Sequence, residues 1–187
     1  MNAPPDAMRI RDETPADWAA IEDLHRRAFG GELEANLVAR LRHDDLVACA
    51  LVADERGAIV GHIVFSWLEV QVDRRDVRAM ALAPLAVRPD RQRRGIGSEL
   101  ARAGLAAARA AGGEAVIVLG HPAYYPRFGF SSALAAKLRA PFKGDAFMAL
   151  ELVLGALAGA SGAVIYPQAF GIPAGKTQGG QANLSGR

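Results

Sequence analysis

The stretch Leu85–Leu100 constrains this chain most, because an apolar strand pattern there runs directly into a basic turn, two glycines and a helical pattern. Gly95 and Gly97 have no Cβ atoms, so a ligand can approach the backbone closely at these positions. The unpaired N–H groups and the dipole of the following helix start favour an anion. Three arginines of the turn add positive charge: Arg91, Arg93 and Arg94. The sequence therefore predicts a site for a phosphate-rich ligand at this turn, with a merely solvated basic turn as the alternative.

The glycine spacing excludes two common phosphate-binding loops. A P-loop requires Gly-x-x-x-x-Gly-Lys-Ser/Thr, and the chain contains no such string. A dinucleotide-binding fingerprint requires a third small residue after Gly-x-Gly-x-x, where this chain has Leu100. The string Gln92-Arg-Arg-Gly-Ile-Gly97 instead has the form Gln-x-x-Gly-x-Gly.

Composition places the chain among single-domain globular proteins. Its 187 residues are 51% apolar, which is enough for a full hydrophobic core. A net charge of +2 gives no strong attraction to nucleic acid or to an anionic membrane. Cys49 is the only cysteine, so no intrachain disulfide is possible and a reducing compartment, the cytoplasm, is expected. The N-terminus has no basic region followed by an apolar core, so no signal peptide is expected.

The segment Ala146–Tyr166 is about as long as a membrane span and holds a single charge, Glu151. Its glycines, among them Gly155 and Gly159, and the inner position of Glu151 favour a buried strand, a glycine-rich turn and a second short strand. No membrane span is therefore expected.

Hydrophobic periodicity predicts alternating helices and strands along most of the chain. The first predicted helix starts at Thr14–Asp17, with Pro15 near its first turn, and runs to Phe29. The other predicted helices are one over Leu33–Leu41, Gly95–Ala111 and a short one over Pro122–Phe128. The predicted strands are Met8–Asp12, Leu46–Ala53, Ala58–Val72, Val77–Val87, Ala115–Leu119, Phe147–Leu154 and Ala163–Tyr166. We expect one domain over residues 8–167 and an extension over residues 168–187, flexible at least from residue 174, where little apolar content remains.

Pro84 interrupts the strand predicted over Val77–Val87. Proline has no N–H to donate to a ladder, so we expect a bulge or a point at which this strand leaves its neighbour. A simple strand end is the alternative.

The string Gln92–Gly97 resembles the acyl-CoA pyrophosphate loop of the GCN5-related N-acetyltransferases, the GNAT superfamily, and the predicted element order β-α-α-β-β-β-α-β-α-β-β is the order of that family. A second string, from Gly120 to Phe130, is similar to the His-Pro-x-Tyr-Tyr-x-x-Phe-Gly-Phe motif of a bacterial branch of predicted acetyltransferases. The resemblance covers about Arg9–Tyr166. It implies an α+β (mixed α/β) acyl-CoA N-acyltransferase fold, with a central, mostly antiparallel sheet that splays between its fourth and fifth strands and is flanked by helices.

This resemblance implies an enzyme that moves an acetyl group directly from acetyl-CoA to an amine, without a covalent acyl-enzyme intermediate. The absence of a Gly-x-Ser-x-Gly elbow and the position of Cys49 in an apolar strand agree with direct transfer. One backbone N–H near Ala83–Leu85 is expected to face the thioester oxygen. The residues implied to bind the cofactor are Leu85, Ala86, Val87, Gln92, Arg93, Arg94, Gly95, Ile96, Gly97 and Ser98.

Tyr125 stands in a Tyr-x-x-x-Gly-Phe string, at the position where many members of the family carry a catalytic tyrosine. Its phenol is expected to protonate the departing thiolate, and a core tyrosine is the alternative. Tyr124 points about 100° away from it on a helix, so we expect Tyr124 to pack or to touch the acceptor.

The base that takes the proton of the amine is left open by the sequence. Family members often use a carboxylate on or near the strand Val77–Val87, and this strand has none. Glu69, His121 and water are the candidates, while a solvated strand glutamate and a turn histidine are the structural alternatives. No metal is expected, because the other histidines lack the spacing of metal ligands: His25, His43 and His62.

The acceptor is expected to be a small-molecule or peptide amine, held by the loops Phe29–Glu32 and Asp73–Asp76 and by the segment after Phe130. A non-catalytic CoA-sensing module of the same fold is the alternative, because the carboxylate is missing. A nucleic-acid contact by Arg88–Arg94 is disfavoured by the low net charge, and neither a nucleic acid nor a membrane is expected as a partner. The chain is expected to be a monomer or a homodimer.

Overall fold

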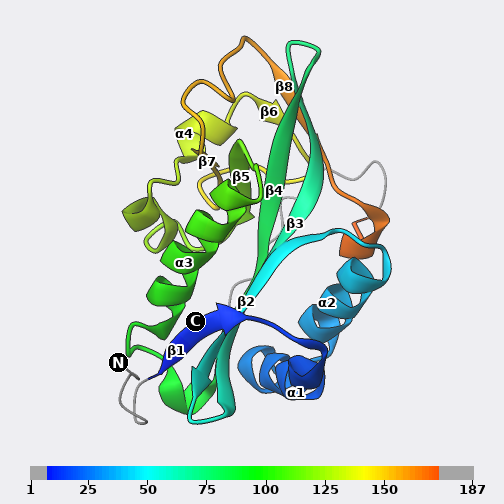
Figure 1. Cartoon of the computed structure of the whole chain (residues 1–187). Coiled ribbons are helices and arrows are strands. Elements are labelled where there is room, and N and C mark those ends of the chain that lie inside the picture. Colours follow the sequence, from blue (N-terminus) through cyan, green and yellow to red (C-terminus); the bar gives the residue numbers. More distant parts are fainter. Residues whose placement is uncertain (1–7, 173–187) are drawn as a thin grey trace.

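The structure is a computed structural model that describes residues 8–172. An eight-stranded sheet forms its centre, with helices α1 (Trp18–Phe29) and α2 (Leu33–His43) toward one side and helix α3 (Ile96–Ala110) toward the other (Figure 1). The extension predicted from residue 168 is described only to residue 172, and the flexible tail predicted from residue 174 lies outside the described residues.

The strands of the sheet are β1 (Arg9–Asp12), β2 (Val47–Glu55), β3 (Ala58–Val72), β4 (Arg75–Val87), β5 (Ala115–Leu119), β6 (Leu138–Arg139), β7 (Phe147–Glu151) and β8 (Gly162–Ile165). Six of them follow one another in the spatial order β1-β2-β3-β4-β5-β7, while β8 pairs with β3 and β6 pairs with β8. The pairings of β4 with β5 and of β6 with β8 are parallel, and the other described pairings are antiparallel. The mixed, mostly antiparallel α+β architecture is therefore confirmed.

Short helical elements join the strands and helices. They are η1 (Pro15–Asp17), η2 (Pro89–Arg91), η3 (Tyr125–Phe128) and η4 (Gln168–Phe170), which are 3₁₀ turns, and the four-residue helix α4 (Ser132–Ala135). Of the helix predicted over Pro122–Phe128, only η3 forms, because Pro126 has no N–H to donate and Gly129 ends the turn with a φ of 95°. Neither α4 nor β6 is predicted by the sequence, because elements of four and two residues are too short to show a hydrophobic period.

The other predicted elements form with shifted ends. β2 continues to Glu55 and β4 begins at Arg75, so the sheet is longer at these points than the apolar patterns indicate. The segment over residues 146–166 forms β7, a turn-rich connection and β8 rather than one helix. Within residues 8–172, no helix is long and apolar enough to cross a membrane.

The fourth strand separates from the fifth, as predicted. β4 and β5 pair in parallel over three residues, and the pairing ends at Ala81. On the opposite edge, Leu82 and Leu85 of β4 face residues of β3 that are only two positions apart, which makes a bulge. Pro84, joined to Ala83 by a cis peptide bond, lies in this bulge. The separation leaves an open edge of β4 directly before the start of α3.

The two faces of β3 belong to two different cores. Phe65 packs toward α3, where Gly104 leaves room for its ring, because a Cβ at that glycine would clash with Phe65. Val64 packs on the opposite face, in a cluster that contains Leu41 of α2. His62 has the same parity along the strand as Val64, so it lies on the α1–α2 face as well.

Candidate active site

The turn that joins β4 to α3 presents a row of free backbone N–H groups. Within the part of the chain that the structure describes, the N–H groups of residues 93–97 donate to no backbone carbonyl, whereas those of Ser98 and Glu99 both donate to the carbonyl of Gly95 (2.9 and 3.0 Å). Left-handed backbone at Arg93 and Gly95, with φ values of 59° and 88°, makes this turn tight. Five donors thus stand together at the positive end of a 15-residue helix, an arrangement that binds anions.

A cleft of ≈ 500 Å³ lies between the end of β4, the start of α3 and the segment that contains η3. Most of the residues predicted to bind the cofactor line it: Leu85, Val87, Gln92, Arg93, Gly95, Ile96, Gly97 and Ser98. The predicted catalytic residue Tyr125 lines the same cleft. The structure therefore brings the two predicted functional motifs, 26 residues or more apart in sequence, to the two walls of one cavity.

Two of the predicted cofactor-binding residues do not line the cleft. Ala86 is fully buried and pairs with His62, so its side chain lies on the sheet face opposite to that of Leu85 and Val87. Arg94 has an exposed side chain outside the cleft lining.

The positive charge of the turn is smaller than its arginine count indicates. Arg91 bonds to Glu55 and to Asp90, at 2.9 Å in each case, and Arg88 bonds to Asp90 as well. Arg93, by contrast, forms no ion pair with any residue in the described ranges and lines the cleft. Arg91 lines the cleft too, as predicted, but its ion pairs with Glu55 and Asp90 reduce the positive charge that it adds for a ligand.

The adjacent tyrosines take different positions, as their helical offset predicts. Tyr125 is only 1% exposed and makes edge contacts with Phe128 and Phe130, at centroid distances of 6.5 and 5.6 Å. Tyr124 reaches the first turn of α3, where its hydroxyl lies 3.4 Å from Oγ of Ser98. One phenol is therefore held in the inner wall of the cleft, and the other borders the turn with the free N–H groups.

The two candidate bases are separated by the fold. His121 is exposed and lines the cleft next to η3. Glu69 is also exposed, but it pairs with Arg78 of β4, which precedes Pro84 by six residues. At about 3.3 Å per strand residue, this places Glu69 roughly 20 Å from the bulge. The structure thus brings His121 to the cleft and leaves Glu69 outside it.

A polar network on the other face of the sheet was not predicted from the sequence. Glu13, which follows β1, accepts hydrogen bonds from Nε2 of His62 (2.8 Å) and from Nη2 of Arg42 (2.6 Å). Nδ1 of His62 lies 2.8 Å from Nε2 of His25, and both rings are fully buried. The network joins the segment after β1 to α1, α2 and β3.

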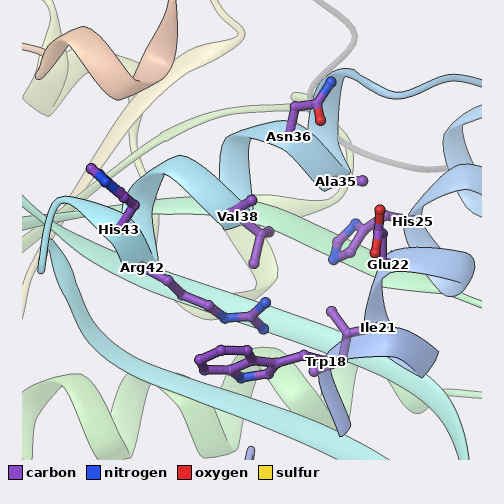
Figure 2. Close-up of a pocket in the computed structure, with 10 residues that line it drawn as sticks. Trp18, Ile21, Glu22, His25, Ala35, Asn36, Val38, Arg42 and His43 are labelled. Atoms are coloured by element: carbon purple, nitrogen blue, oxygen red, sulfur yellow. The ribbon is translucent and has the colours of Figure 1, made fainter. Parts of the chain in front are cut away.

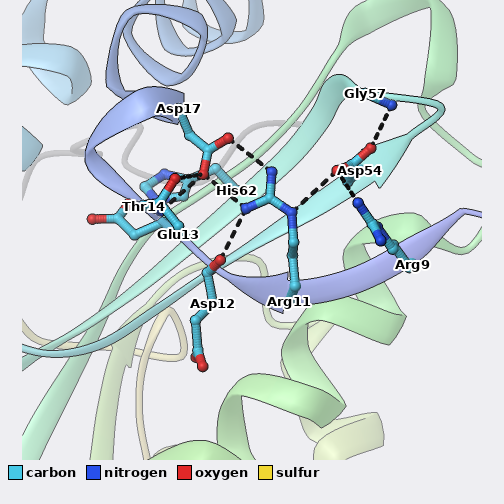
Figure 3. Close-up of polar contacts among 9 residues, drawn as sticks. All are labelled: Arg9, Arg11, Asp12, Glu13, Thr14, Asp17, Asp54, Gly57 and His62. Atoms are coloured by element: carbon cyan, nitrogen blue, oxygen red, sulfur yellow. Dashed lines mark hydrogen bonds and ion pairs between the residues drawn. The ribbon is translucent and has the colours of Figure 1, made fainter.

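A second cluster of charges adjoins this network. The guanidinium of Arg11 bonds to both carboxylate oxygens of Asp17 (2.8 Å each) and to Asp54 (3.1 Å). Figure 3 shows that this guanidinium lies between the two carboxylates, with Arg9 approaching Asp54 from the far side. Hydrogen bonds from Arg11 lower the pKa of Asp17, against the effect of burial, so this carboxylate is ionised at neutral pH.

The protonation states follow from the hydrogen bonds. Burial opposes a charge on Glu13, but the hydrogen bonds from His62 and Arg42 outweigh it and lower the pKa of Glu13 to about 2. Burial is the main cause that lowers the pKa of His25 to about 3. Burial also lowers the pKa of His62, against the opposing effect of its hydrogen bond to Glu13. We therefore assign an ionised Glu13 that accepts the Nε2 proton of a neutral His62, whose Nδ1 accepts the Nε2 proton of a neutral His25. Such histidines are poor acceptors for the proton of an amine at neutral pH, which argues against this network as the base.

A cavity of ≈ 380 Å³ between α1 and α2 lies beside the network. Figure 2 shows the guanidinium of Arg42 beside the ring of Trp18, and the two are 4.8 Å apart from Cζ to ring centroid. Arg42 is at the same time bonded to Glu13, and Glu22, on the wall formed by α1, is paired with Arg26. These two charged side chains of the lining thus already have partners within the protein, in contrast to the donors of the cleft beside α3.

Sequence comparisons find a family and named relatives. Residues 9–133 match the family model described as "Acetyltransferase (GNAT) domain". The chain is 39% identical over 166 residues to the uncharacterized N-acetyltransferase YhbS of Escherichia coli strain K12, a match that covers 87% of this chain and 98% of that protein. It is also 40% identical over 124 residues to the uncharacterized N-acetyltransferase YjhQ of the same strain, covering 65% of this chain and 68% of that protein.

Solved structures give the same result. The crystal structure of YhbS from Escherichia coli in complex with CoA superposes with a TM-score of 0.81 at 34% identity, covering 100% of this chain and 99% of that chain. A GNAT family acetyltransferase from Brucella melitensis, crystallised in complex with acetyl-CoA, superposes with a TM-score of 0.72 at 34% identity and covers 88% and 99% of the two chains.

Proposed function

The chain belongs to the GNAT family and is an acetyl-CoA-dependent N-acetyltransferase, and we propose that the cleft between β4, α3 and η3 is its active site. Its family transfers the acetyl group directly, without a covalent acyl-enzyme. The observation that carries the assignment of the site is the row of free N–H groups at residues 93–97 in the wall of the cleft.

The residues of the turn fit the pyrophosphate of CoA. Phosphate oxygens are acceptors, and the N–H groups of residues 93–97 supply donors that the protein itself does not use. Arg93 adds a positive charge without a carboxylate partner among the described residues. At Gly97 a Cβ would lie 3.1 Å from the hydroxyl of Tyr124, so a side chain there would fill the space between the two walls. These features support a pyrophosphate site at the turn.

The open edge of β4 continues the cleft toward the bulge at Pro84. Because the pairing with β5 has ended there, the backbone of Leu85 and Val87 can pair with the amides of the pantetheine arm as an added strand would. One N–H near residues 83–85 is assigned to the thioester oxygen, where a donor stabilises developing negative charge. When bound, acetyl-CoA supplies the activated acetyl group.

Tyr125 is assigned as the proton donor to the thiolate of CoA. Its ring is fixed by Phe128 and Phe130 in the inner wall of the cleft. A phenol held in one orientation pays little entropy when it donates a proton, and general acid assistance is worth roughly 10²–10⁴-fold in rate.

His121 is assigned as the base that accepts the proton of the acceptor amine, directly or through a water molecule. His121 lines the cleft, whereas Glu69 lies about six strand residues from the bulge, roughly 20 Å away. The acceptor is a small-molecule or peptide amine in this proposal. We place the enzyme in the cytoplasm, because the single cysteine suits a reducing compartment, and we expect a monomer or a homodimer.

The experiment that tests the function measures both the binding of acetyl-CoA and the rate of acetyl transfer. Acetyl-CoA is titrated by calorimetry, and acetyl transfer is then followed with peptide N-termini, lysine side chains, polyamines and aminoglycosides. Turnover of one acceptor supports the enzyme, whereas tight binding without turnover of any acceptor supports a CoA-sensing module of the same fold. For the acceptor found, the variant His121→Gln should lower kcat at least tenfold with unchanged affinity for acetyl-CoA, and unchanged kcat assigns the base elsewhere.

A further inference from the structure

The wall of the cleft that contains η3 carries a basic group that the proposed function does not use. Arg127 lines the cleft and has an exposed side chain. Its guanidinium lies over the ring of Tyr124, 4.7 Å from Cζ to the ring centroid, and Nη2 donates to the carbonyl of Ala123 (3.3 Å). No carboxylate in residues 8–172 pairs with it.

The arginines around the cleft therefore fall into two groups. Arg88 and Arg91 are held by carboxylates of the protein, Asp90 and Glu55. Arg93, on the wall of the turn, and Arg127, on the wall of η3, lack such partners and face the cleft from opposite sides. A ligand that spans the cleft thus meets two separate positive charges.

CoA carries two separate anionic groups that match this arrangement. One is the pyrophosphate between pantetheine and ribose, and the other is the 3′-phosphate of the ribose. The donors at residues 93–97 and Arg93 already provide for the pyrophosphate, which leaves the 3′-phosphate without an assigned partner. A planar guanidinium binds a phosphate with two parallel hydrogen bonds, which a point charge cannot do.

We propose that Arg127, oriented by the ring of Tyr124, binds the 3′-phosphate of CoA and makes the enzyme prefer CoA over dephospho-CoA. This inference rests on the proposed function, because it requires CoA to occupy the cleft. Stacking on Tyr124 restricts the guanidinium before the ligand arrives, so less side-chain entropy is lost on binding. Tyr124 thereby acts as a positioning residue for Arg127, separate from the catalytic role assigned to Tyr125.

The chain offers a matched control for Arg127. Arg102 is also an exposed arginine stacked on an aromatic ring of η3, at 5.6 Å from the centroid of Phe128, but it does not line the cleft. Replacing Arg102 removes the same charge and the same kind of stacking without touching the cleft. Any difference between the two variants therefore reports contact with the ligand rather than net charge.

The test is a calorimetric titration of CoA and of dephospho-CoA into the full-length chain and its variants. The wild type should bind CoA about tenfold more tightly than dephospho-CoA, the size expected for a charge-assisted hydrogen bond at a partly exposed site. Arg127→Gln should lose this preference, because its affinity for CoA falls while its affinity for dephospho-CoA does not. Arg102→Gln should keep the preference. Tyr124→Phe, which retains the ring, should also keep most of the preference, and Tyr124→Leu should reduce it.

Several outcomes would overturn the inference. Equal binding of CoA and dephospho-CoA by the wild type contradicts it, as does an equal loss of both affinities in Arg127→Gln, which would place Arg127 on the pyrophosphate. If Arg127→Gln does not fold, Arg127→Lys provides the test, because lysine keeps the positive charge but lacks the planar guanidinium. This variant should show a reduced preference for CoA over dephospho-CoA. An unchanged preference would contradict the proposed role of the guanidinium. A wild type that binds neither ligand contradicts the proposed function itself.

Discussion

On the α3 side of the sheet, the turn before α3 presents the N–H groups of residues 93–97 without backbone acceptors, whereas on the α1–α2 side Glu13, Arg42 and His62 bond to one another. The first region offers backbone donors, and an arginine, Arg93, that have no partner among the described residues. The second is rich in titratable groups, but its charges are already compensated. The comparison indicates that unused donors at a cleft, rather than a concentration of charged side chains, locate the binding site of this enzyme.

The energetic consequences of the two regions differ accordingly. Removing a donor from the turn costs no internal hydrogen bond, so affinity for the cofactor should fall while the fold persists. Removing one member of the buried network leaves its partners without compensation, so stability should fall while affinity persists.

The largest effect is expected for Gly97→Asp. The new side chain would lie near the hydroxyl of Tyr124 and would place a negative charge beside the pyrophosphate. Calorimetry should show a loss of acetyl-CoA affinity of at least about 100-fold, since steric exclusion and like-charge repulsion add. Gly31→Asp is the control of equal charge, because its Cβ would have nothing within 4 Å, and it should bind acetyl-CoA as the wild type does.

Next in size is the loss of turnover in Tyr125→Phe. If the phenol protonates the thiolate, kcat should fall by roughly 10- to 1,000-fold while the affinity for acetyl-CoA stays near that of the wild type. Tyr124→Phe should cost less in kcat. A Tyr125→Phe enzyme that turns over at the wild-type rate would show that the proton donor lies elsewhere.

On the other side of the sheet, Glu13→Gln should lower stability instead of binding. The variant leaves Arg42 with an uncompensated charge in a largely buried place, since the two side chains are 13% and 16% exposed. We expect the free energy of unfolding to fall by about 2–3 kcal/mol, somewhat below the cost at a fully buried pair. Denaturant titration measures this loss, and calorimetry should find acetyl-CoA affinity unchanged. Glu22→Gln, in an exposed pair with Arg26, should change stability by less than about 0.5 kcal/mol.

The smallest predicted effect is a loss of stability in mild acid. The pKa of His25 is about 3 in the folded protein and about 6.5 in the unfolded chain, so below pH 6.5 the unfolded chain binds a proton that the folded protein does not. Stability should therefore fall by about 1–2 kcal/mol between pH 7 and pH 5, and His62 adds to the fall in the same direction. The pKa of Glu13 is lowered to about 2, so its contribution is lost only below about pH 4.5.

The melting temperature measured from pH 8 to pH 4 checks this window. His25→Asn removes one of the titrating groups and should flatten the curve between pH 7 and pH 5. An equally steep curve in the variant would mean that His25 is not the buried neutral group that the hydrogen-bond network indicates.

The sequence predicted the cleft beside α3 better than the buried network of Glu13, His25, Arg42 and His62. The reason is that the turn of the cleft is formed by residues close together in the sequence, whereas the network joins residues that are far apart. The turn is formed by neighbouring residues: Gly95 supplies left-handed backbone, and Gly97 keeps the wall of the cleft free of a side chain. Pro84 likewise marks the bulge by its own chemistry, since it lacks an N–H. Local chemistry of this kind is readable without knowledge of the fold.

The network, in contrast, depends on the tertiary arrangement. His25 and His62 are 37 residues apart, and Glu13 is 49 residues from His62, so their spacing in the sequence carries no sign of contact. His62, a histidine between apolar residues of β3, is a signal in the sequence that a polar group is buried there, but it does not indicate which residues bond to it. The pairing of Arg91 with Glu55 was hidden in the same way, because the partner lies 36 residues away.

The most direct measurement compares the two sides of the sheet in one experiment, by following backbone amide signals in NMR as CoA is added. We expect the largest shifts at residues 93–97, with further shifts at Ser98 and Tyr124, and nearly unchanged signals for Glu13, His25 and His62. Shifts centred on the α1–α2 side, with the turn unaffected, would show that the unused donors before α3 do not hold the cofactor.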